Sequence, residues 1–547
     1  MVRTTMGSID RRSFLLDASL LCTLGALGSG RSLAGGSASA VAASKVDSYT
    51  LDFGYTNRLL GTYSVRLRNY GLAGKAMTIP GPILETRGGR TLRVLHRNRI
   101  STRAGIVDGD GVPAPAGLDP HNNPHNFDVT NLHVHGLQTI PHLFEPLGTT
   151  NPDAPPITIN PQSSYAYDFP IPEDHPGGLY AYHPHQHGSA GVGVMSGATG
   201  AIIIRGEIDD VPEIKACREA VVAINSVYLN DNNQPFGRYG LSFDPYTAPP
   251  QGYSQEAFRL YTVNGAPVMK VDAPNFNGGT VTEAIRPPTL KMRPGEIVRL
   301  RFLNATAADA FQIVAGAGEM RWYSQDGVNF TSLVQTGTDP GNCVFTPPLG
   351  RSEVLLRAPD KKGEFFIHTL ENNLVEMPTP EMKLLRVVVE GSPKSGMKFP
   401  SSLPKPMREY PLLQAKDVKR KRTILWTANS PYPSLVSGLA FQINNKSYEN
   451  NQFIASPSVG DVEEWTLKNE TPFGHPVHIH VNSMQVVDAN LSATQPRFCD
   501  VLWMPANSEV SMRMRFKQWS GKTVMHCHIM PHEDQGMMTN ILIKKRS

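Results

Sequence analysis

The sequence has no large excess of either charge, because 52 lysine and arginine residues stand against 48 aspartate and glutamate residues in 547. It has no long basic run, so we expect no nucleic-acid partner. No apolar stretch is long enough to span a bilayer, so we expect no stable membrane anchor. No long stretch shows the 3.6-residue periodicity of an amphipathic helix, which argues against an all-helical fold.

Cysteine is also scarce, with five residues in the whole chain. Cys22 lies in an N-terminal segment that we expect to be removed, and Cys527 belongs to a histidine-rich motif near the C-terminus. Cys217, Cys343 and Cys499 remain, an odd number that permits at most one disulfide among them. We predict a Cys217–Cys343 disulfide, with buried free thiols as the alternative.

The first 43 residues resemble an export signal. Two adjacent arginines stand in the run Asp10-Arg11-Arg12-Ser13-Phe14-Leu15-Leu16, and a mildly apolar stretch follows from Leu20 to Leu27. Small residues come next, at Ala38-Ser39-Ala40 and Ala40-Val41-Ala42. This pattern predicts a twin-arginine signal peptide over residues 1–43, with the twin-arginine export machinery as a partner. The expected location is a bacterial periplasm or the cell exterior.

The rest of the chain shows short β-like runs between turns that contain glycine, proline or asparagine. Examples are Thr91–Val94, Ala201–Ile204, Ile297–Phe302 and Val462–Leu467. Many short strands with regular turn signals predict an all-β fold built from β-sandwiches. A chain of this length exceeds one hydrophobic core, so roughly two to four domains are expected.

A weak internal repeat indicates three copies of one unit. A glycine turn, a strand and an asparagine recur three times, with the asparagines at Asn98, Asn304 and Asn469. Gly/Ser/Pro-rich stretches near Arg205–Val211 and Gly391–Lys405 are typical of linkers. We therefore predict domains over residues 46–206, 207–392 and 393–547.

The most informative stretch runs from His526 to Met537. On a strand, His526 and His528 would point one way and Cys527 the other, so one tripeptide could serve two metal sites. A thiolate, an imidazole and a thioether, offered by Cys527, His532 and Met537, are the ligand types of a blue copper site. Such a site needs a second histidine from elsewhere. A buried strand with a structural cysteine is the alternative.

Histidines are paired far more often than chance allows. Random placement of 17 histidines in 547 residues would give about 0.5 His-x-His pairs, whereas the sequence contains five. Two regions of the first third and two of the last third carry them, which predicts a shared site between the first and last domains. Eight imidazoles in one place suit a copper cluster better than a single zinc ion. The pairs are His133-Val134-His135, His183-Pro184-His185, His185-Gln186-His187, His478-Ile479-His480 and His526-Cys527-His528.

With these four motifs in order, the chain resembles the three-domain multicopper oxidases, a laccase-like family of cupredoxin repeats. The resemblance covers essentially the whole chain after the signal and implies three cupredoxin-like Greek-key β-sandwich domains. It also implies four copper ions: one type 1, one type 2 and two type 3.

The resemblance assigns every copper ligand to a position of this sequence. His475, Cys527 and His532 resemble the type 1 ligands, with Met537 as the weak axial ligand. His133 and His478 resemble the type 2 ligands. The type 3 pair would be bound by His135, His183, His185, His480, His526 and His528. His187 is expected to be structural or to support a ligand, and the remaining histidines, His142 among them, are interpreted as ordinary core or surface residues.

Reduction of O₂ to water consumes four protons, so carboxylates near the cluster should matter. Glu533 follows ligand His532 directly and matches an acidic position of periplasmic relatives, which predicts a proton-donor role. Some relatives carry a carboxylate shortly after the first motif. Phe144 stands at that position here, which leaves the neighbouring Glu145 as a weaker candidate.

The predicted function is an exported oxidase in which Cys527 takes part in electron transfer. It would oxidise a small-molecule or metal-ion donor by single electrons and reduce O₂ to water. The donor stays open between phenols or aromatic amines and cuprous ion, because the methionines form no dense run. The alternative is a non-catalytic copper-binding or envelope scaffold protein of the same fold.

Overall fold

The structure, a computed structural model, describes residues 45–101, 120–122, 125–230, 257–272, 283–405, 412–429, 440–487 and 497–546. The predicted signal peptide, residues 1–43, lies outside them. The described chain forms six β-sheets connected by loops and short helices. The predicted all-β fold class is confirmed.

Residues 46–205 form two four-stranded sheets, with strand orders β2-β1-β4-β6 and β3-β8-β7-β5. Helix α1 (Ala190–Met195) lies between the last two strands. The strands are β1 (Val46–Leu60), β2 (Tyr63–Leu72), β3 (Gly81–Arg87), β4 (Thr91–Asn98), β5 (His133–His135), β6 (Ser164–Pro170), β7 (Gly178–His183) and β8 (Gly200–Arg205), and a 3₁₀ turn, η1, spans Pro120–Asn122.

The middle of the chain forms an eight-stranded sheet, β12-β11-β10-β9-β14-β19-β16-β17, and a five-stranded sheet, β13-β21-β20-β15-β18. Two short helices, η2 (Glu207–Asp210) and α2 (Pro212–Lys215), lead into it. The strands are β9 (Arg218–Asn230), β10 (Ala257–Val263), β11 (Ala266–Asp272), β12 (Glu283–Ala284), β13 (Thr289–Met292), β14 (Ile297–Asn304), β15 (Phe311–Ala315), β16 (Glu319–Gln325), β17 (Val328–Gln335), β18 (Val344–Thr346), β19 (Arg351–Arg357), β20 (Gly363–Thr369) and β21 (Met382–Val389).

The last part forms a six-stranded sheet, β23-β22-β25-β30-β27-β28, and a five-stranded sheet, β24-β32-β31-β26-β29. Helix α3 (Met530–Asp534) follows β31, and η4 (Ala415–Asp417) precedes β22. The strands are β22 (Arg420–Asn429), β23 (Ala440–Ile443), β24 (Phe453–Ala455), β25 (Val462–Asn469), β26 (His475–Ile479), β27 (Met484–Val487), β28 (Phe498–Cys499), β29 (Val501–Met504), β30 (Glu509–Arg515), β31 (Gly521–Cys527) and β32 (Met538–Ile543).

The same strand pairing occurs in each of the three parts. One sheet of each part contains a parallel pair, β1 with β4, β9 with β14, and β22 with β25. The other sheet contains the parallel pairs β3 with β8, β13 with β21, and β24 with β32. Each sheet takes its strands from one of the three predicted segments. This repetition supports the predicted three-domain division, whose boundaries stay a prediction.

The three asparagines of the sequence repeat have one structural role. Each ends the equivalent strand, β4, β14 or β25, and accepts a hydrogen bond at Oδ1 from the backbone N–H two residues later. Each Nδ2 donates to two backbone carbonyls that come from two separate segments of the chain. The side chain therefore satisfies the polar backbone groups that a buried turn would otherwise leave unpaired.

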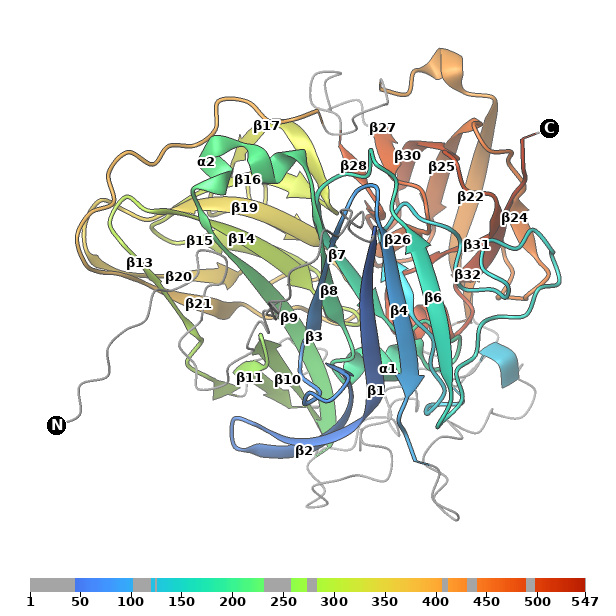
Figure 1. Cartoon of the computed structure of the whole chain (residues 1–547), viewed down its shortest axis with the longest axis horizontal. Helices are drawn as coiled ribbons and strands as arrows, with labels where there is room; N and C mark the ends of the chain where they lie inside the picture. The colour runs from blue at the N-terminus through green and yellow to red at the C-terminus, as the bar shows by residue number, and fades with distance from the viewer. Residues whose placement is uncertain are drawn as a thin grey trace, which may run out of the picture.

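In Figure 1 the strands β1–β8 lie in the middle, β9–β21 to the left and β22–β32 to the right. Apolar contacts join neighbouring parts, since Ala308, Ala310 and Val375 belong to the same buried cluster as Cys527 and Met537. The middle part thus packs against the strands that carry the last predicted copper motif.

The predicted Cys217–Cys343 disulfide is wrong, because both residues are free thiols. Each sulfur donates a hydrogen bond to a nearby carbonyl, Cys217 Sγ to Glu213 O at 3.2 Å and Cys343 Sγ to Pro340 O at 3.3 Å. The alternative of free thiols holds for these two residues. Among the described residues, no helix combines the length and apolar character needed to cross a membrane.

Candidate metal centres

Strand pairing brings the four predicted copper motifs together in two pairs. β5 carries the first motif and pairs antiparallel with β7, which places His133 opposite His183. β26 carries part of the third motif and pairs with β31, which places His478 opposite His526. β31 is buried at every residue and ends at Cys527. Two antiparallel strand pairings thus position four of the predicted ligands.

Eight histidines from these motifs form one buried cluster, which we call the histidine cluster. Their ring nitrogens converge in three groups. The first group consists of His133 Nε2 and His478 Nε2, which lie 3.3 Å apart. The members of the cluster are His133, His135, His183, His185, His478, His480, His526 and His528, each at most 3% exposed.

The second group brings His526 Nε2 within 3.1 Å of both His185 Nε2 and His480 Nε2. In the third group, His135 Nδ1 lies 3.4 Å from His183 Nε2 and 3.2 Å from His528 Nε2. Two imidazoles that bind one metal ion at about 2 Å in a tetrahedral arrangement are themselves about 3.3 Å apart. The three groups therefore fit three metal ions.

Hydrogen bonds on the outer ring nitrogens select the tautomer that metal binding requires. His183 Nδ1 lies 2.8 Å from Pro184 O, and His526 Nδ1 lies 2.9 Å from Cys527 O. A carbonyl can only accept, so Nδ1 carries the proton in both rings and Nε2 presents its lone pair to the cluster.

His142 performs the same task for His133, although the sequence interpretation left it as an ordinary residue. Its Nδ1–H donates to Ile140 O at 3.0 Å, which leaves its Nε2 as an acceptor. This nitrogen accepts from His133 Nδ1–H at 2.9 Å and from the Val134 backbone N–H at 3.2 Å. His133 Nε2 is therefore free to bind a metal. The one sequence feature that could have pointed to this role is that His142 stands seven residues after His135, the end of the first motif.

Asp500 contacts two further members of the histidine cluster. Its backbone carbonyl accepts from His478 Nδ1 at 2.7 Å, and its Oδ1 lies 3.0 Å from His135 Nε2. These contacts leave His478 Nε2 and His135 Nδ1 to face the cluster. No sequence signal pointed to Asp500.

The cluster histidines are neutral at pH 7. Burial lowers the pKa of His183 and of His185 to about 3, although Glu533 opposes the shift of His185. Burial lowers the pKa of His526 to about 4. Only a neutral imidazole binds a metal ion, so burial prepares these side chains as ligands.

The predicted proton donor Glu533 lies inside this arrangement. Its Oε1 is 3.2 Å from His185 Nδ1 and its Oε2 is 3.1 Å from His526 Nδ1, although neither contact has hydrogen-bond geometry. Burial raises the pKa of Glu533 to about 7, while the nearby His185 opposes the shift. A carboxyl group that can gain or lose a proton near neutral pH thus lies beside two predicted ligands.

A second site, the Cys527 site, lies on the other side of the same strand. Cys527 Sγ is 3.3 Å from His475 Nδ1 and 3.6 Å from His532 Nδ1. Met537 is fully buried, and its backbone carbonyl accepts from Cys527 N–H at 3.0 Å. Burial raises the pKa of the Cys527 thiol, so a thiolate here needs a bound cation to stabilise it.

The outer nitrogens of both histidines at the Cys527 site also have partners. His475 Nε2 lies 2.9 Å from the hydroxyl of Thr471, and His532 Nε2 lies 3.3 Å from Glu376 Oε2. Glu376 belongs to the loop between β20 and β21, and its side chain keeps 26% of its surface exposed. The donor sets fit copper at both sites, since imidazole with thiolate is a soft set and imidazole alone suits copper.

The remaining candidates lie further away. His187 Nε2–H donates to Asn122 Oδ1 at 3.2 Å, and its structural or supporting role stays a prediction. Glu145 is exposed, and its backbone N–H donates to Pro155 O at 3.0 Å. Its proton-donor role therefore stays a prediction without structural support. Phe144, which replaces the expected carboxylate, is buried beside Tyr448.

The fold and the two sites together define an all-β protein with a cysteine-containing site joined to a histidine cluster, both with donor sets that fit metal ions. The family model described as multicopper oxidase matches residues 412–547. A laccase from Bacillus subtilis (strain 168) is 26% identical over 255 residues, which cover 41% of this chain and 49% of the relative. The chain thus spans about half the length of this curated relative, and 22% and 16% of the laccases from Bacillus stratosphericus and Haloferax volcanii.

Two solved structures share the fold over most of the chain. A multicopper oxidase from Campylobacter jejuni, titled a metallo-oxidase, has a TM-score of 0.63 and 20% identity and covers 92% of both chains. A multicopper oxidase from Aquifex aeolicus has a TM-score of 0.65 and 18% identity, covering 91% of this chain and 96% of the other. The predicted cupredoxin-like fold is confirmed. Residues 412–547 thus match the multicopper oxidase family model, and the chain as a whole shares the fold of solved multicopper oxidases.

Proposed function

We propose that this chain is an exported multicopper oxidase that takes single electrons from a donor and reduces O₂ to two water molecules with four electrons and four protons. One observation carries this proposal. Cys527 faces His475 and His532, while its chain neighbours His526 and His528 both face the histidine cluster. One tripeptide thus connects a site suited to single electrons with a site suited to several metal ions.

Copper bound at these donors would supply one-electron acceptance at the Cys527 site and four-electron reduction of O₂ at the histidine cluster. His475, Cys527 and His532, with Met537 as axial ligand, would hold a type 1 ion. His133 and His478 would hold a type 2 ion, and the other six cluster histidines two type 3 ions. The three nitrogen groups and the Cys527 site support a total of four ions.

Glu533 is the residue that we assign to proton delivery. It lies against His185 and His526, and burial raises its pKa to about 7. A group with this pKa can release a proton to the cluster and be protonated again at neutral pH. Glu145 is exposed, so we assign it no part in this step.

Electrons would reach the Cys527 site through His532, whose outer nitrogen contacts Glu376. The exposed part of Glu376 lets a donor approach this histidine. A carboxylate at this point can accept the proton of a phenol or pair with a cationic donor, so it is compatible with phenols, aromatic amines and cuprous ion alike. Export by the twin-arginine machinery to the periplasm or cell exterior belongs to the same proposal and is supported by residues 1–43.

Copper counting and O₂ uptake test the proposal. The copper-loaded protein should contain four copper ions and consume O₂ with at least one member of a panel of cuprous, ferrous and manganous ions, phenols and bilirubin. The Cys527→Ser variant should lose the blue absorption and O₂ uptake while the histidine cluster keeps its copper. A parent protein that binds copper but consumes no O₂ with any donor supports the alternative of a copper-binding scaffold.

A further inference from the structure

The middle part of the chain contributes none of the predicted copper ligands, yet one of its side chains, Arg351, binds a residue that contacts the histidine cluster. Arg351, the first residue of β19, is fully buried. Its guanidinium forms a bidentate ion pair with Asp500 of the last part, with Nη1 at 2.7 Å from Oδ1 and Nη2 bonded to Oδ2. Two parallel hydrogen bonds fix both the position and the orientation of the Asp500 carboxylate.

Asp500 in turn orients one predicted ligand from the first part and one from the last. Its Oδ1, which Arg351 contacts, also lies 3.0 Å from His135 Nε2, and its carbonyl accepts from His478 Nδ1 at 2.7 Å. His135 is a predicted type 3 ligand and His478 a predicted type 2 ligand. The position of one aspartate therefore affects two of the three nitrogen groups.

Asp326, in the turn between β16 and β17, strengthens this connection. Its Oδ1 accepts from the Arg351 backbone N–H at 2.9 Å. Its Oδ2 accepts from the backbone N–H groups of Asp500 and Val501 at 3.2 and 3.1 Å. The backbone of Asp500 and its side chain are thus both fixed by the middle part.

Gly136, which follows the first motif, shows how closely this ion pair packs on the ligands. Its φ is +86°, a conformation that favours glycine. A Cβ at this position would overlap Arg351 Nη2 and Asp500 Oδ2. The glycine of the His-x-His-Gly motif therefore leaves the space that the Arg351–Asp500 pair occupies.

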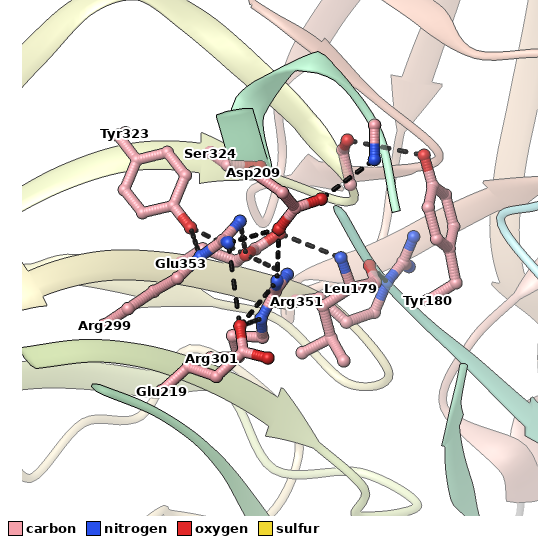
Figure 2. A network of polar contacts seen from close by, with 12 residues as sticks. Leu179, Tyr180, Asp209, Glu219, Arg299, Arg301, Tyr323, Ser324, Arg351 and Glu353 are labelled. Carbon is pink, nitrogen blue, oxygen red and sulfur yellow. Dashed lines mark hydrogen bonds and ion pairs between the residues drawn. The ribbon is translucent and has the colours of Figure 1, made fainter. Parts of the chain in front are cut away.

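β19 also contacts β7, the strand that ends at ligand His183. Glu353 Oε1 accepts from Leu179 N–H at 2.8 Å, and Arg351 Nε donates to Leu179 O at 3.4 Å. Figure 2 shows the contact of Glu353 with Leu179, with Glu353 in turn bound by Arg299 and Arg301. β19 thus fixes a ligand-bearing strand of the first part as well as Asp500 of the last.

We propose that Arg351 is a positioning residue of the histidine cluster, which holds Asp500 so that His135 and His478 present their lone pairs to copper. This inference rests on the proposed function and extends it, because it gives the middle domain a part in building the cluster. Removing the guanidinium would leave the Asp500 carboxylate buried without its counter-ion, and it would then turn toward another partner or become protonated.

The test compares Arg351→Met and Arg351→Lys with a matched control, Arg301→Met. Arg301 is likewise a fully buried arginine of the middle part, and its ion pairs are with Asp209, Glu219 and Glu353. Each copper-loaded variant would be examined by electron paramagnetic resonance of the type 2 copper, copper content per chain and thermal unfolding. Substitutions that disturb the partner of a metal ligand weaken metal affinity roughly 10–100-fold.

We expect Arg351→Met to alter or abolish the type 2 signal and to lower the copper content, while the type 1 absorption stays unchanged. Arg351→Lys should recover part of the signal, because a lysine keeps the charge without the bidentate geometry. Arg301→Met should unfold at a lower temperature but keep the parent type 2 spectrum, because Arg299 and Tyr323 still bind Glu353 and Arg301 makes no contact with Asp500.

Two results would overturn the inference: a parent-like type 2 spectrum and copper content in Arg351→Met, or an equal loss in Arg301→Met. If Arg351→Met does not fold, Arg351→Lys and Asp500→Asn carry the same comparison, and unaltered spectra in both would refute it. If the parent protein binds four copper ions and the variants have the parent spectrum and copper content, only the inference about Arg351 is contradicted. A parent that binds no copper contradicts the proposed function as well.

Discussion

The histidine cluster and the Cys527 site share β31 but have opposite surroundings. Around the Cys527 site the ring of Phe441 stacks on His532 with centroids 3.7 Å apart, and the polar partners are a hydroxyl and the partly exposed Glu376. Around the cluster, Asp500, Glu533 and His142 are all buried and polar. Under the proposed function, the Cys527 site would only pass electrons, which suits its largely apolar surroundings. The histidine cluster would also consume protons, which the buried polar groups around it would carry.

The largest effect is expected from Glu533→Gln, which tests whether the histidine cluster, unlike the Cys527 site, needs a proton donor. Replacing Glu533 with glutamine keeps the shape of the side chain but removes its acidity, so O₂ reduction should slow by roughly 10²–10⁴-fold. The type 1 absorption and the copper content should stay as in the parent, because Glu533 is not a predicted ligand. Steady-state O₂ uptake with a fixed donor measures the effect.

Glu376→Gln is the matched control at the other region. It removes a carboxylate that contacts a predicted ligand of the Cys527 site, so it should change the KM for the donor and leave O₂ reduction largely intact. Equal losses of turnover in both variants would contradict the assignment of proton delivery to Glu533.

The second effect concerns acid stability in the copper-free protein. His526 has a pKa of about 4 because it is buried, against an ordinary value near 6.5. Between these values the unfolded chain binds a proton at this histidine and the folded chain does not. The free energy of unfolding therefore falls as the pH falls from 6.5 to about 4, by about 1.4 kcal/mol per pH unit for such a histidine.

In the His526→Asn variant, the slope of the free energy of unfolding against pH should decrease by the contribution of about one proton. Chemical unfolding at several pH values measures this slope. His532→Asn should flatten it less, because burial lowers the pKa of His532 while Glu376 opposes the shift. An equal change of slope in both variants would show that the two regions do not differ in their acid response.

The predicted ligands and the residues that contact them differ in how far the sequence could predict them. The predicted ligands stand in four short motifs whose spacing follows the two-residue period of a strand. The structure brings all eleven histidine and cysteine candidates together at the two sites. The all-β class and the threefold repeat of an asparagine also followed from local patterns. Such local patterns can be interpreted from sequence, because residues two apart on a strand point to the same face of the sheet.

The partners of the ligands were not predictable in the same way. Asp500 and Arg351 lie far apart in the chain, and their pairing depends on how the middle part packs against the last. His142 was missed because nothing in the sequence shows that its ring lies within 2.9 Å of His133. The disulfide prediction failed for the same reason, since compartment and cysteine count do not report distance.

A third prediction compares the hydrogen-bond partner of a ligand in each region. His142→Leu removes the acceptor of His133 Nδ1–H, so His133 should lose its fixed tautomer and orientation. Copper at the type 2 position should bind roughly 10–100-fold more weakly, as measured by titration with a chelator. Thr471→Val removes the partner of His475 and should affect the type 1 absorption instead. Loss of type 2 copper in Thr471→Val and not in His142→Leu would reverse the comparison.

The smallest expected effect lies at Met537. If its thioether is the axial ligand, it donates electron density that stabilises the oxidised ion, and Met537→Leu should raise the type 1 potential by an amount on the order of 59 mV, a tenfold change for one electron. Leucine has a similar volume, so the buried packing around Cys527 should change little. The type 2 spectrum should stay unchanged, because no cluster ligand contacts this side chain among the described hydrogen bonds. A potential equal to that of the parent would mean that Met537 only fills space, and that the Cys527 site is tuned by its aromatic surroundings alone.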